Sequence, residues 1–290
     1  MMRLALTLIA LAFATPALAQ LAPFKDRLFG YPAILETRNG GREIVVDYDK
    51  RRDIIGRDAV PRRKAKGAYV DTWKVRWARK VISFPVQGGS RKAFAVGARR
   101  NAKVTVIYVH GKGGNRRQGV SDVSFGGNFN RLQNLMVRNG GLLLTPDVVG
   151  FGRRGTEEIA ALIAHARRGS PRGRIVLACG SMGGRICWAL LGRPVVAGEL
   201  SGVVLLGAQG HEPFLKSAEI RKDAAGVPIT MAIGGSDQVF DPATQIGFFR
   251  RLVKRAPRYP ARLIVFRTGV HGTPIRMIDW RVELNRLLSS

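Results

Sequence analysis

The segment that most constrains the fold is a short aliphatic run ending at a serine surrounded by small residues. Residues 175–184 read Ile-Val-Leu-Ala-Cys-Gly-Ser-Met-Gly-Gly, and a helical segment follows. Small side chains around Ser181 allow a strand and a helix to approach each other closely across a tight turn. The segment therefore predicts a strand, a strained turn at Ser181 and a helix.

The rest of the chain alternates between short apolar runs typical of strands and segments with the residue spacing of helices. Predicted strands cover residues 104–109, 141–145, 175–179, 203–206, 229–233 and 263–266. Predicted helices, besides the one after Ser181, cover residues 129–137, 156–168, 242–254 and 278–288. Such alternation implies right-handed crossovers and a mostly parallel sheet with helices on both faces. We therefore predict the α/β class, with chemistry at the carboxyl ends of the strands.

Two segments before this alternation have a different pattern. Residues 73–84 and 92–96 read as two strands around Gly88-Gly89, which is the signal of an antiparallel hairpin. Residues 20–70 are polar, basic and rich in turn residues, and we expect little regular structure there apart from a strand at 43–46. The predicted organisation is a basic N-terminal extension over residues 20–70 and one domain over residues 71–290.

The helix predicted at residues 156–168 carries clear signals at both ends. Thr156 is expected to cap its N-terminus, where Glu157 and Glu158 would face the positive end of the helix dipole. Two arginines occupy its last turn, and a glycine then ends it.

The first 19 residues have the features of a secretory signal peptide. Arg3 gives a positive start, residues 4–14 form an apolar stretch of 11 residues, and Ala-Leu-Ala at 17–19 is a cleavage site. A membrane anchor would need about 20 apolar residues, so we expect cleavage at this site. No later stretch of the sequence is long and apolar enough to span a membrane. We therefore expect a periplasmic or secreted protein.

The two cysteines, Cys179 and Cys187, flank the serine of the first motif. A bridge between them would have to join the end of a strand to the second turn of the next helix. Two small, buried and unbridged side chains are the favoured interpretation, with the bridge as the alternative. Stability is expected to come from the core rather than from a disulfide framework.

The chain is strongly basic, with 48 Lys and Arg residues against 20 Asp and Glu residues and a formal net charge of +28. Such a charge concentrates anions, polyanions and anionic lipid head groups near the surface. The basic residues are spread along the chain, with a denser stretch at 62–66, and a generally basic surface accounts for them equally well. We find no nucleic-acid motif and no aromatic platform, so no specific nucleic-acid partner is predicted.

Five short loop motifs follow predicted strands in a fixed order. They are His110-Gly111-Lys112-Gly113-Gly114, Asp147-Val148-Val149-Gly150-Phe151-Gly152, Gly180-Ser181-Met182-Gly183-Gly184, Gly235-Ser236-Asp237 and Val270-His271-Gly272. With these motifs in this order, residues 73–290 resemble the α/β-hydrolase superfamily of serine esterases and lipases. One departure is Cys179, which stands where the elbow motif has its first glycine. Cysteine is small enough for that position, so the departure weakens the motif more than the chemistry.

The resemblance implies Ser181 as the nucleophile, and a serine hydroxyl needs a base within hydrogen-bond reach. His271 follows the last strand, where the family's base lies, and the chain order Ser…Asp…His is then met. Among the other histidines, His211 is a rival base and His165 is expected on the solvated surface. The resemblance implies a structural role for His110 in the oxyanion loop.

The acid that orients the base is Asp237 or Asp241, with Glu212 as a third candidate. Asp241 precedes Pro242, and Asp-Pro is typical of an N-cap followed by a proline in the first helical turn. Asp237 has no such structural duty and follows a strand directly, so it is preferred.

An oxyanion hole needs two backbone N–H groups directed at the charge that develops during the reaction. The resemblance places one on Met182, after the nucleophile, and the other in the glycine-rich turn, at Lys112. A phosphate cradle is the alternative for that turn, but the spacing of a P-loop is missing. The interpretation implies no metal and no organic cofactor.

Basic residues gather in the loops at the predicted catalytic edge, namely Lys112, Arg116, Arg117, Arg153, Arg154 and Arg185. If these cations converge, they would attract an ester with an anionic group, and Arg153, Arg154 and Arg185 are the candidate substrate-binding residues. A chance gathering in so basic a chain is the alternative. About twenty residues separate the strand ending near 206 from the one beginning near 228, which predicts little or no lid.

These features together predict an exported serine hydrolase that cleaves a small-molecule or lipid-like carboxylic ester with a triad of Ser181, His271 and Asp237. Amide, thioester or acyl-transfer chemistry would use the same residues, because a fold alone does not choose among them. The alternative is a non-catalytic protein of the same fold that binds anionic polymers or lipids of the cell envelope.

Overall fold

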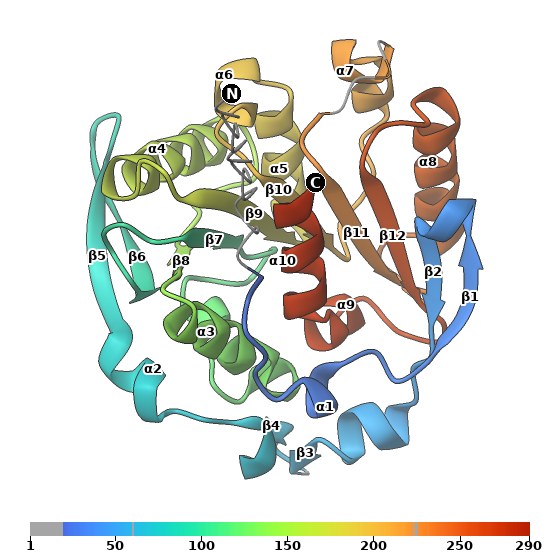
Figure 1. Cartoon of the computed structure of the whole chain (residues 1–290), viewed down its shortest axis with the longest axis horizontal. Coiled ribbons are helices and arrows are strands. Elements are labelled where there is room, and N and C mark those ends of the chain that lie inside the picture. Colours follow the sequence, from blue (N-terminus) through green and yellow to red (C-terminus); the bar gives the residue numbers. More distant parts are fainter. Residues whose placement is uncertain (1–19, 60, 222, 224–225) are drawn as a thin grey trace, which may run out of the picture.

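The centre of the molecule is a ten-stranded sheet within the described part of the chain (Figure 1). The computed structural model describes residues 20–290 apart from residues 60, 222 and 224–225, so the predicted signal segment at 1–19 lies outside the described residues. The strand order is β1-β2-β12-β11-β10-β9-β7-β8-β6-β5. The strands are β1 Ile34–Arg38, β2 Glu43–Val46, β5 Arg79–Val86, β6 Gly89–Gly97, β7 Val104–Val109, β8 Leu142–Pro146, β9 Arg174–Gly180, β10 Gly202–Leu206, β11 Ile229–Gly234 and β12 Ala261–Phe266.

Parallel pairing dominates the sheet, as the alternating sequence predicts. In the order given above, every pair of neighbours from β2 through β8 is parallel. Antiparallel pairs occur at both edges, where β1 joins β2 and the hairpin of β5 and β6 joins β8. The α/β class and the hairpin around Gly88-Gly89 are therefore confirmed.

Helices cover both faces of this sheet. They are α1 Asp26–Phe29, α2 Trp73–Ala78, α3 Asn128–Arg138, α4 Arg153–Gly169, α5 Gly184–Leu191, α6 Pro194–Ala197, α7 Ala218–Arg221, α8 Pro242–Arg255, α9 Thr273–Met277 and α10 Trp280–Ser289. One apolar core joins α4, α5 and α8 to the sheet, and a second joins α3, α9 and α10 to the opposite face. Successive residues of a strand alternate between the two cores: Ile107 and Val109 belong to the first and Tyr108 to the second.

The segment over residues 20–70 contains more regular structure than its composition suggests. It forms α1, β1, β2 and a two-stranded pair, β3 Asp58–Ala59 and β4 Lys64–Ala65. The expected strand at 43–46 is confirmed, and it pairs in parallel with β12. Figure 1 shows this segment, in blue, running past α10 and α3 to the edge of the sheet. The Leu21 N–H group donates to Asn285 Oδ1 at 2.8 Å, so the segment is bound to the last helix.

Two local expectations are wrong. Residues 73–78 form α2 rather than the beginning of a strand. Their alternation of apolar and basic residues imitates a strand, but Val75 alone of them is fully buried. The helix α4 begins at Arg153, so Thr156 lies inside it, and the Thr156 hydroxyl donates to the Gly152 carbonyl oxygen at 3.0 Å.

The connection between β10 and β11 is short, in line with the predicted lack of a lid. Its described residues form only a 3₁₀ segment at Glu212–Lys216 and the single turn of α7. In the part of the chain that the structure describes, no helix has both the length and the apolar character needed to cross a membrane.

Candidate active site

Ser181 occupies the sharp turn that the sequence predicts between β9 and α5. Its φ of 49° lies in the left-handed region, which non-glycine residues adopt rarely and at a cost in strain. The neighbouring glycines are needed for space, because a Cβ atom on Gly183 would lie 2.8 Å from the His110 carbonyl oxygen. This turn lifts the Ser181 side chain to the carboxyl edge of the sheet.

Three side chains from separate loops meet in a hydrogen-bonded chain at this edge. The His271 Nε2 atom lies 2.8 Å from Ser181 Oγ, and His271 Nδ1 lies 2.8 Å from Asp237 Oδ2. Asp237 follows β11 and His271 follows β12, whose carboxyl ends lie close to that of β9. Because the carboxylate accepts the proton of Nδ1, the Nε2 atom is left to accept the serine proton.

The carboxylate of Asp237 is held on its other side by backbone groups. Its Oδ1 atom accepts hydrogen bonds from the amides of Val239 at 2.7 Å and Phe240 at 3.1 Å. The residue is only 6% exposed. The ring of Phe240 packs edge-on against the His271 ring at 5.4 Å between centroids. These contacts fix the direction in which the carboxylate meets the imidazole.

The two alternative acids are engaged elsewhere. Asp241 caps α8, because its Oδ2 atom accepts hydrogen bonds from the Thr244 amide at 2.8 Å and the Thr244 hydroxyl at 2.6 Å. These hydrogen bonds lower the pKa of the Asp241 carboxyl. Glu212 forms an ion pair with Arg251 on the surface. The structure therefore brings Asp237, and neither alternative, to His271.

The other histidines have distinct surroundings. His110 Nε2 accepts a hydrogen bond from the Val148 amide at 3.2 Å, so its Nδ1 carries the proton and donates to the Gly111 carbonyl oxygen at 2.8 Å. His165 is half-buried beside Phe84 rather than fully solvated. Burial lowers the pKa of the His165 imidazole.

The rival base His211 lies in the same region but makes a different contact. Its ring stacks on the Trp188 indole, with 6.2 Å between centroids. Burial lowers the pKa of the His211 imidazole, which favours the uncharged form. His271, and not His211, makes the hydrogen bond to Ser181.

The glycine-rich turn after β7 packs directly against the serine. A Cβ atom on Gly111 would lie 2.9 Å from Ser181 Cβ and 3.4 Å from Ser181 Oγ, so only glycine fits there. Met182 follows the serine and lines the cavity next to it, while Lys112 is exposed on the turn. The turn is therefore close enough to Ser181 to contribute to an oxyanion hole.

A cavity of about 640 Å³ opens beside Ser181. The residues that line it are Phe151, Gly152, Arg153, Thr156, Ser181, Met182, Arg185, Trp188, Ala189, Arg193, Gln209, Gly210, His211 and Phe240. This lining includes three arginines and a histidine but no aspartate or glutamate.

The structure separates the candidate substrate-binding arginines. Arg153 and Arg185 line the cavity, whereas Arg154 lies outside the lining, 3.5 Å from Glu158. Arg193 also lines the cavity, and sequence reasoning missed it. It stands in the turn after α5, without a motif that would mark it.

Arg116, another of the loop cations, does not reach the cavity. Its guanidinium pairs with Asp147 and lies over the Phe94 ring, 5.8 Å from the centroid. Asp147 Oδ1 also accepts a hydrogen bond from the backbone amide of Arg116, with 2.9 Å between the two atoms.

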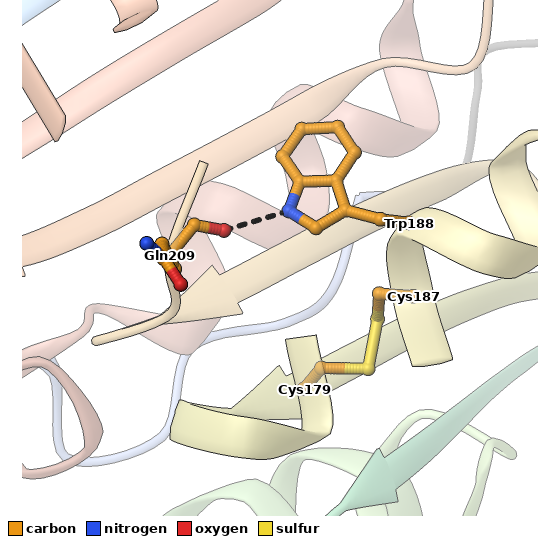
Figure 2. Close-up of a disulfide and its surroundings, with 4 residues drawn as sticks. All are labelled: Cys179, Cys187, Trp188 and Gln209. Atoms are coloured by element: carbon orange, nitrogen blue, oxygen red, sulfur yellow. Dashed lines mark hydrogen bonds between the residues drawn. A yellow bond between two sulfur atoms is a disulfide. The ribbon is translucent and has the colours of Figure 1, made fainter. Parts of the chain in front are cut away.

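Cys179 and Cys187 form a disulfide across the turn, so the favoured interpretation of two unbridged cysteines is wrong (Figure 2). The sharp turn brings the end of β9 to the second turn of α5, and the two Cα atoms lie 6.3 Å apart. Both cysteines are fully buried. The next residue, Trp188, donates its indole N–H to the Gln209 carbonyl oxygen at 2.8 Å. The bridge thus joins the strand that leads to Ser181 to the helix that carries Trp188, a residue of the cavity lining.

Among the residues that the structure describes, no three His, Cys, Asp or Glu side chains gather as a group able to hold a metal ion.

Comparison with known proteins gives matches to solved structures alone. No family model and no curated protein matches the sequence. An esterase from Pyrococcus furiosus is similar at 14% identity, with a TM-score of 0.56 and coverage of 76% of this chain and 95% of that chain. A serine hydrolase without a lid from Xanthomonas campestris is similar at 13% identity, with a TM-score of 0.53 and coverage of 73% of this chain and 94% of that chain.

Both neighbours match nearly their whole length at low sequence identity, so the likeness concerns the fold. The chain has the fold of the α/β-hydrolase superfamily.

Proposed function

We propose that the protein is a serine hydrolase that cleaves a carboxylic ester through an acyl-enzyme. The observation that carries this proposal is the chain of two 2.8 Å contacts from Ser181 through His271 to Asp237. Each group has the partner that its role requires: a hydroxyl beside a base, and a base beside a buried carboxylate. The two structural neighbours, an esterase and a serine hydrolase, support the same reaction class.

In the proposed first step, Ser181 Oγ attacks the ester carbonyl carbon while His271 Nε2 removes the hydroxyl proton. Asp237 stabilises the imidazolium that forms. The amides of Met182 and Lys112 would donate hydrogen bonds to the negative oxygen of the tetrahedral intermediate. Loss of one such donor typically lowers the rate by about 10²–10³-fold.

The intermediate collapses when His271 gives its proton to the oxygen of the departing alcohol, which leaves the acyl group on Ser181. Water then attacks the acyl carbon as His271 removes a proton from it. The second tetrahedral intermediate breaks down when His271 gives this proton to Ser181 Oγ, which releases the acid and restores the serine hydroxyl. Amide, thioester and acyl-transfer reactions would follow the same steps with another leaving or attacking group. The esterase neighbour favours an ester as substrate.

The signal-like first 19 residues support a place of action outside the cytoplasm, after removal of that segment. Expression in a bacterium with subsequent mass spectrometry of the periplasmic and secreted fractions tests this. We expect a chain that begins near Gln20, and a full-length cytoplasmic chain would contradict export.

A fluorophosphonate probe tests the proposed nucleophile directly, because it labels serines activated by a base. We expect labelling of the wild type and none of Ser181→Ala. Hydrolysis of 4-nitrophenyl acetate should fall by about 10⁴–10⁶-fold in Ser181→Ala and by about 10⁴-fold in Asp237→Asn. Asp241→Asn is the matched control, since it changes an aspartate four positions away that caps α8, and it should keep its activity.

The net charge of +28 supports a second candidate, a non-catalytic protein that binds envelope polyanions or anionic lipids. A wild type that resists the probe but binds heparin or anionic vesicles in a salt-sensitive manner would favour it over the hydrolase.

A further inference from the structure

The cavity beside Ser181 combines a reactive centre with an unbalanced positive charge. Three arginines line it, from the first turn of α4, from the first turn of α5 and from the turn after α5. No carboxylate belongs to the lining. A cavity lined in this way attracts a negative group, because three positive charges and no negative charge border it.

Two of these arginines form no ion pair with the described residues. The described residues contain no carboxylate within ion-pair distance of Arg153 or Arg185. The hydrogen bond from Arg193, and to a smaller extent the charge of Arg153, lower the pKa of Glu157, which lies outside the cavity lining. Arg193 forms a surface pair with Glu157 at 2.9 Å. Arg153 and Arg185 therefore keep guanidinium groups at the cavity that can pair with carboxylate or phosphate oxygens of a bound molecule.

The two arginines line the same cavity as Ser181, the proposed nucleophile. Arg185 lies four residues after Ser181, one helical turn along the same segment, so the two residues share one side of the cavity. Arg153 follows Gly152, the N-cap of α4, and the amino end of this helix faces the same cavity. The positive end of the helix dipole adds to the attraction that the side chains exert.

The remaining wall is aromatic. Trp188 is held by its hydrogen bond to the Gln209 carbonyl oxygen, and His211 stacks on its indole ring. Phe151 and Phe240 complete this part of the lining. The cavity thus has an apolar side that accommodates a hydrocarbon portion and a cationic side that accommodates an oxyanion.

On this basis, and given the proposed hydrolase function, we infer that the substrate is an ester bearing a carboxylate or phosphate group, bound by Arg153 and Arg185 in the cavity beside Ser181. Arg193 contributes less, because Glu157 already neutralises part of its charge. The arginines select among esters, while the triad performs the reaction.

Matched ester pairs test the inference. On the alcohol side, 4-acetoxybenzoate and 4-acetoxyphenyl phosphate are compared with neutral methyl 4-acetoxybenzoate. On the acyl side, the 4-nitrophenyl monoester of adipate is compared with 4-nitrophenyl hexanoate. The measured quantity is the ratio of kcat/KM for the anionic ester to that for the neutral one. The intrinsic reactivities of the esters cancel when the ratio in the wild type is compared with the ratio in a variant. Comparison of 4-acetoxybenzoate with 4-acetoxyphenyl phosphate shows whether the cavity prefers a carboxylate or a phosphate.

We expect Arg153→Gln/Arg185→Gln to lower this ratio by about ten- to a hundred-fold in at least one pair, since each lost charge-assisted hydrogen bond is worth about tenfold or more. Arg154→Gln is the matched control: it removes the same charge from the adjacent residue, outside the cavity lining, and should leave the ratio unchanged. Added salt should lower the ratio in the wild type more than in the double variant.

The possible failures can be told apart. An unchanged ratio in every pair, with full hydrolysis of the neutral esters, would overturn the anionic substrate and leave the hydrolase. An equal fall of the ratio in Arg154→Gln would also overturn it, because general surface charge would then explain the effect. A wild type that neither hydrolyses any ester nor reacts with the fluorophosphonate probe would overturn the hydrolase itself.

Discussion

The two helical layers are held to the sheet by different means. The layer of α4, α5 and α8 packs through a large apolar core, with the Cys179–Cys187 bridge at the turn before α5. The opposite layer of α3, α9 and α10 has an apolar core as well, but it also buries arginine side chains. Arg131 is fully buried there, and Arg57 and Arg276 are nearly so.

Arg131 on α3 shows how the second layer uses its charge. Its guanidinium pairs with Asp26 at 2.9 Å and with Asp279 at 3.0 Å, and it donates to the Phe24 carbonyl oxygen at 3.3 Å. It also lies over the Phe29 ring, 5.1 Å from the centroid. The arginine thereby joins the N-terminal segment to α3 and to the cap of α10.

Arg276 and Arg57 play the same part at the other end of this layer. Arg276 makes a bidentate pair with Asp58, at 2.6 and 3.1 Å. Burial, together with the nearby Arg276, lowers the pKa of Arg57 to about 10. Arg57 donates to the Gly126 carbonyl oxygen at 3.1 Å. Arginines thus have two roles in this molecule. In the second layer they are buried in ion pairs and hydrogen bonds with the protein, whereas at the cavity Arg153 and Arg185 form no ion pair with the described residues.

The largest effect is expected from breaking the buried pair of the second layer. Arg131→Met should lower the free energy of unfolding by about 3–5 kcal/mol, because it leaves Asp279 buried without its charged partner. Urea unfolding measures this loss. Arg138→Met on the same helix, where the pair with Asp71 is partly exposed, should cost less than about 1 kcal/mol. Equal losses would show that the buried arginine has no special part in this layer.

The first layer should respond to loss of its bridge. Cys179→Ala/Cys187→Ala should lower the free energy of unfolding by about 2–3 kcal/mol, the value for a loop of this length in the chain-entropy account. Unfolding with and without a reducing agent provides the control, because the agent should destabilise the wild type but not the double variant. A reducing agent without effect on the wild type would contradict the contribution of the bridge.

A third ion pair lies at the edge of the sheet, where Glu43 of β2 pairs with Arg250 of α8, and it affects stability at acid pH. Burial raises the pKa of the Glu43 carboxyl, but the guanidinium groups of Arg250 and Arg38 outweigh it, and the pKa ends below its ordinary value. The stabilisation from this carboxylate is therefore present above its ordinary pKa and is lost as the pH falls through the lowered one. Arg250→Met should move the acid-unfolding midpoint, followed by circular dichroism, to higher pH.

Arg251→Met is the control for this change, since its guanidinium pairs with the exposed Glu212. It should leave the acid midpoint near that of the wild type. If both variants shift it equally, general surface charge and not the Glu43 pair governs acid stability.

The smallest effect on stability is expected at the cavity itself. Glu157→Gln removes a partner of Arg193 from a pair in which the two side chains are 35% and 52% exposed. The free energy of unfolding should change by less than about 0.5 kcal/mol. The kcat/KM for an anionic ester should stay equal or rise, because Arg193 is freed. A large stability loss would show that the cavity arginines are structural like those of the second layer.

The sheet and the positions of Ser181, Asp237 and His271 could be predicted because each depends on local signals. Apolar runs mark buried strands, and in a parallel sheet their carboxyl ends meet at one edge. The turn at Ser181 needs small neighbours, which the sequence supplies. The capping role of Asp241 could also be predicted locally, from the proline that follows it.

The second layer could not be predicted in the same way. Helix α3 buries polar side chains, namely Asn128, Asn130, Arg131, Gln133 and Asn134. In the sequence they look like a solvated face, because their partners come from distant segments. Asn134, for example, donates to the Asp71 carbonyl oxygen at 2.8 Å. Hydrophobic periodicity carries no information on such contacts.

A difference of three residues between the predicted and the observed start of α4 changes which arginines reach the cavity. Because α4 begins at Arg153 and not at Thr156, Arg153 and Arg154 lie on the helix rather than in a loop. Neighbouring residues of a helix point in directions about 100° apart. Arg153 accordingly lines the cavity and Arg154 does not, a difference that the sequence leaves open.

The hydrogen bond between Leu21 and Asn285 bears on the order in which the molecule becomes ordered during synthesis. Residue 21 leaves the ribosome long before α10 exists, and β2 likewise waits for β12. Contacts between such distant positions form slowly, since the intervening chain must first be brought together. The segment that follows residue 20 is therefore synthesised before its partners and reaches its place only when the last helix is present.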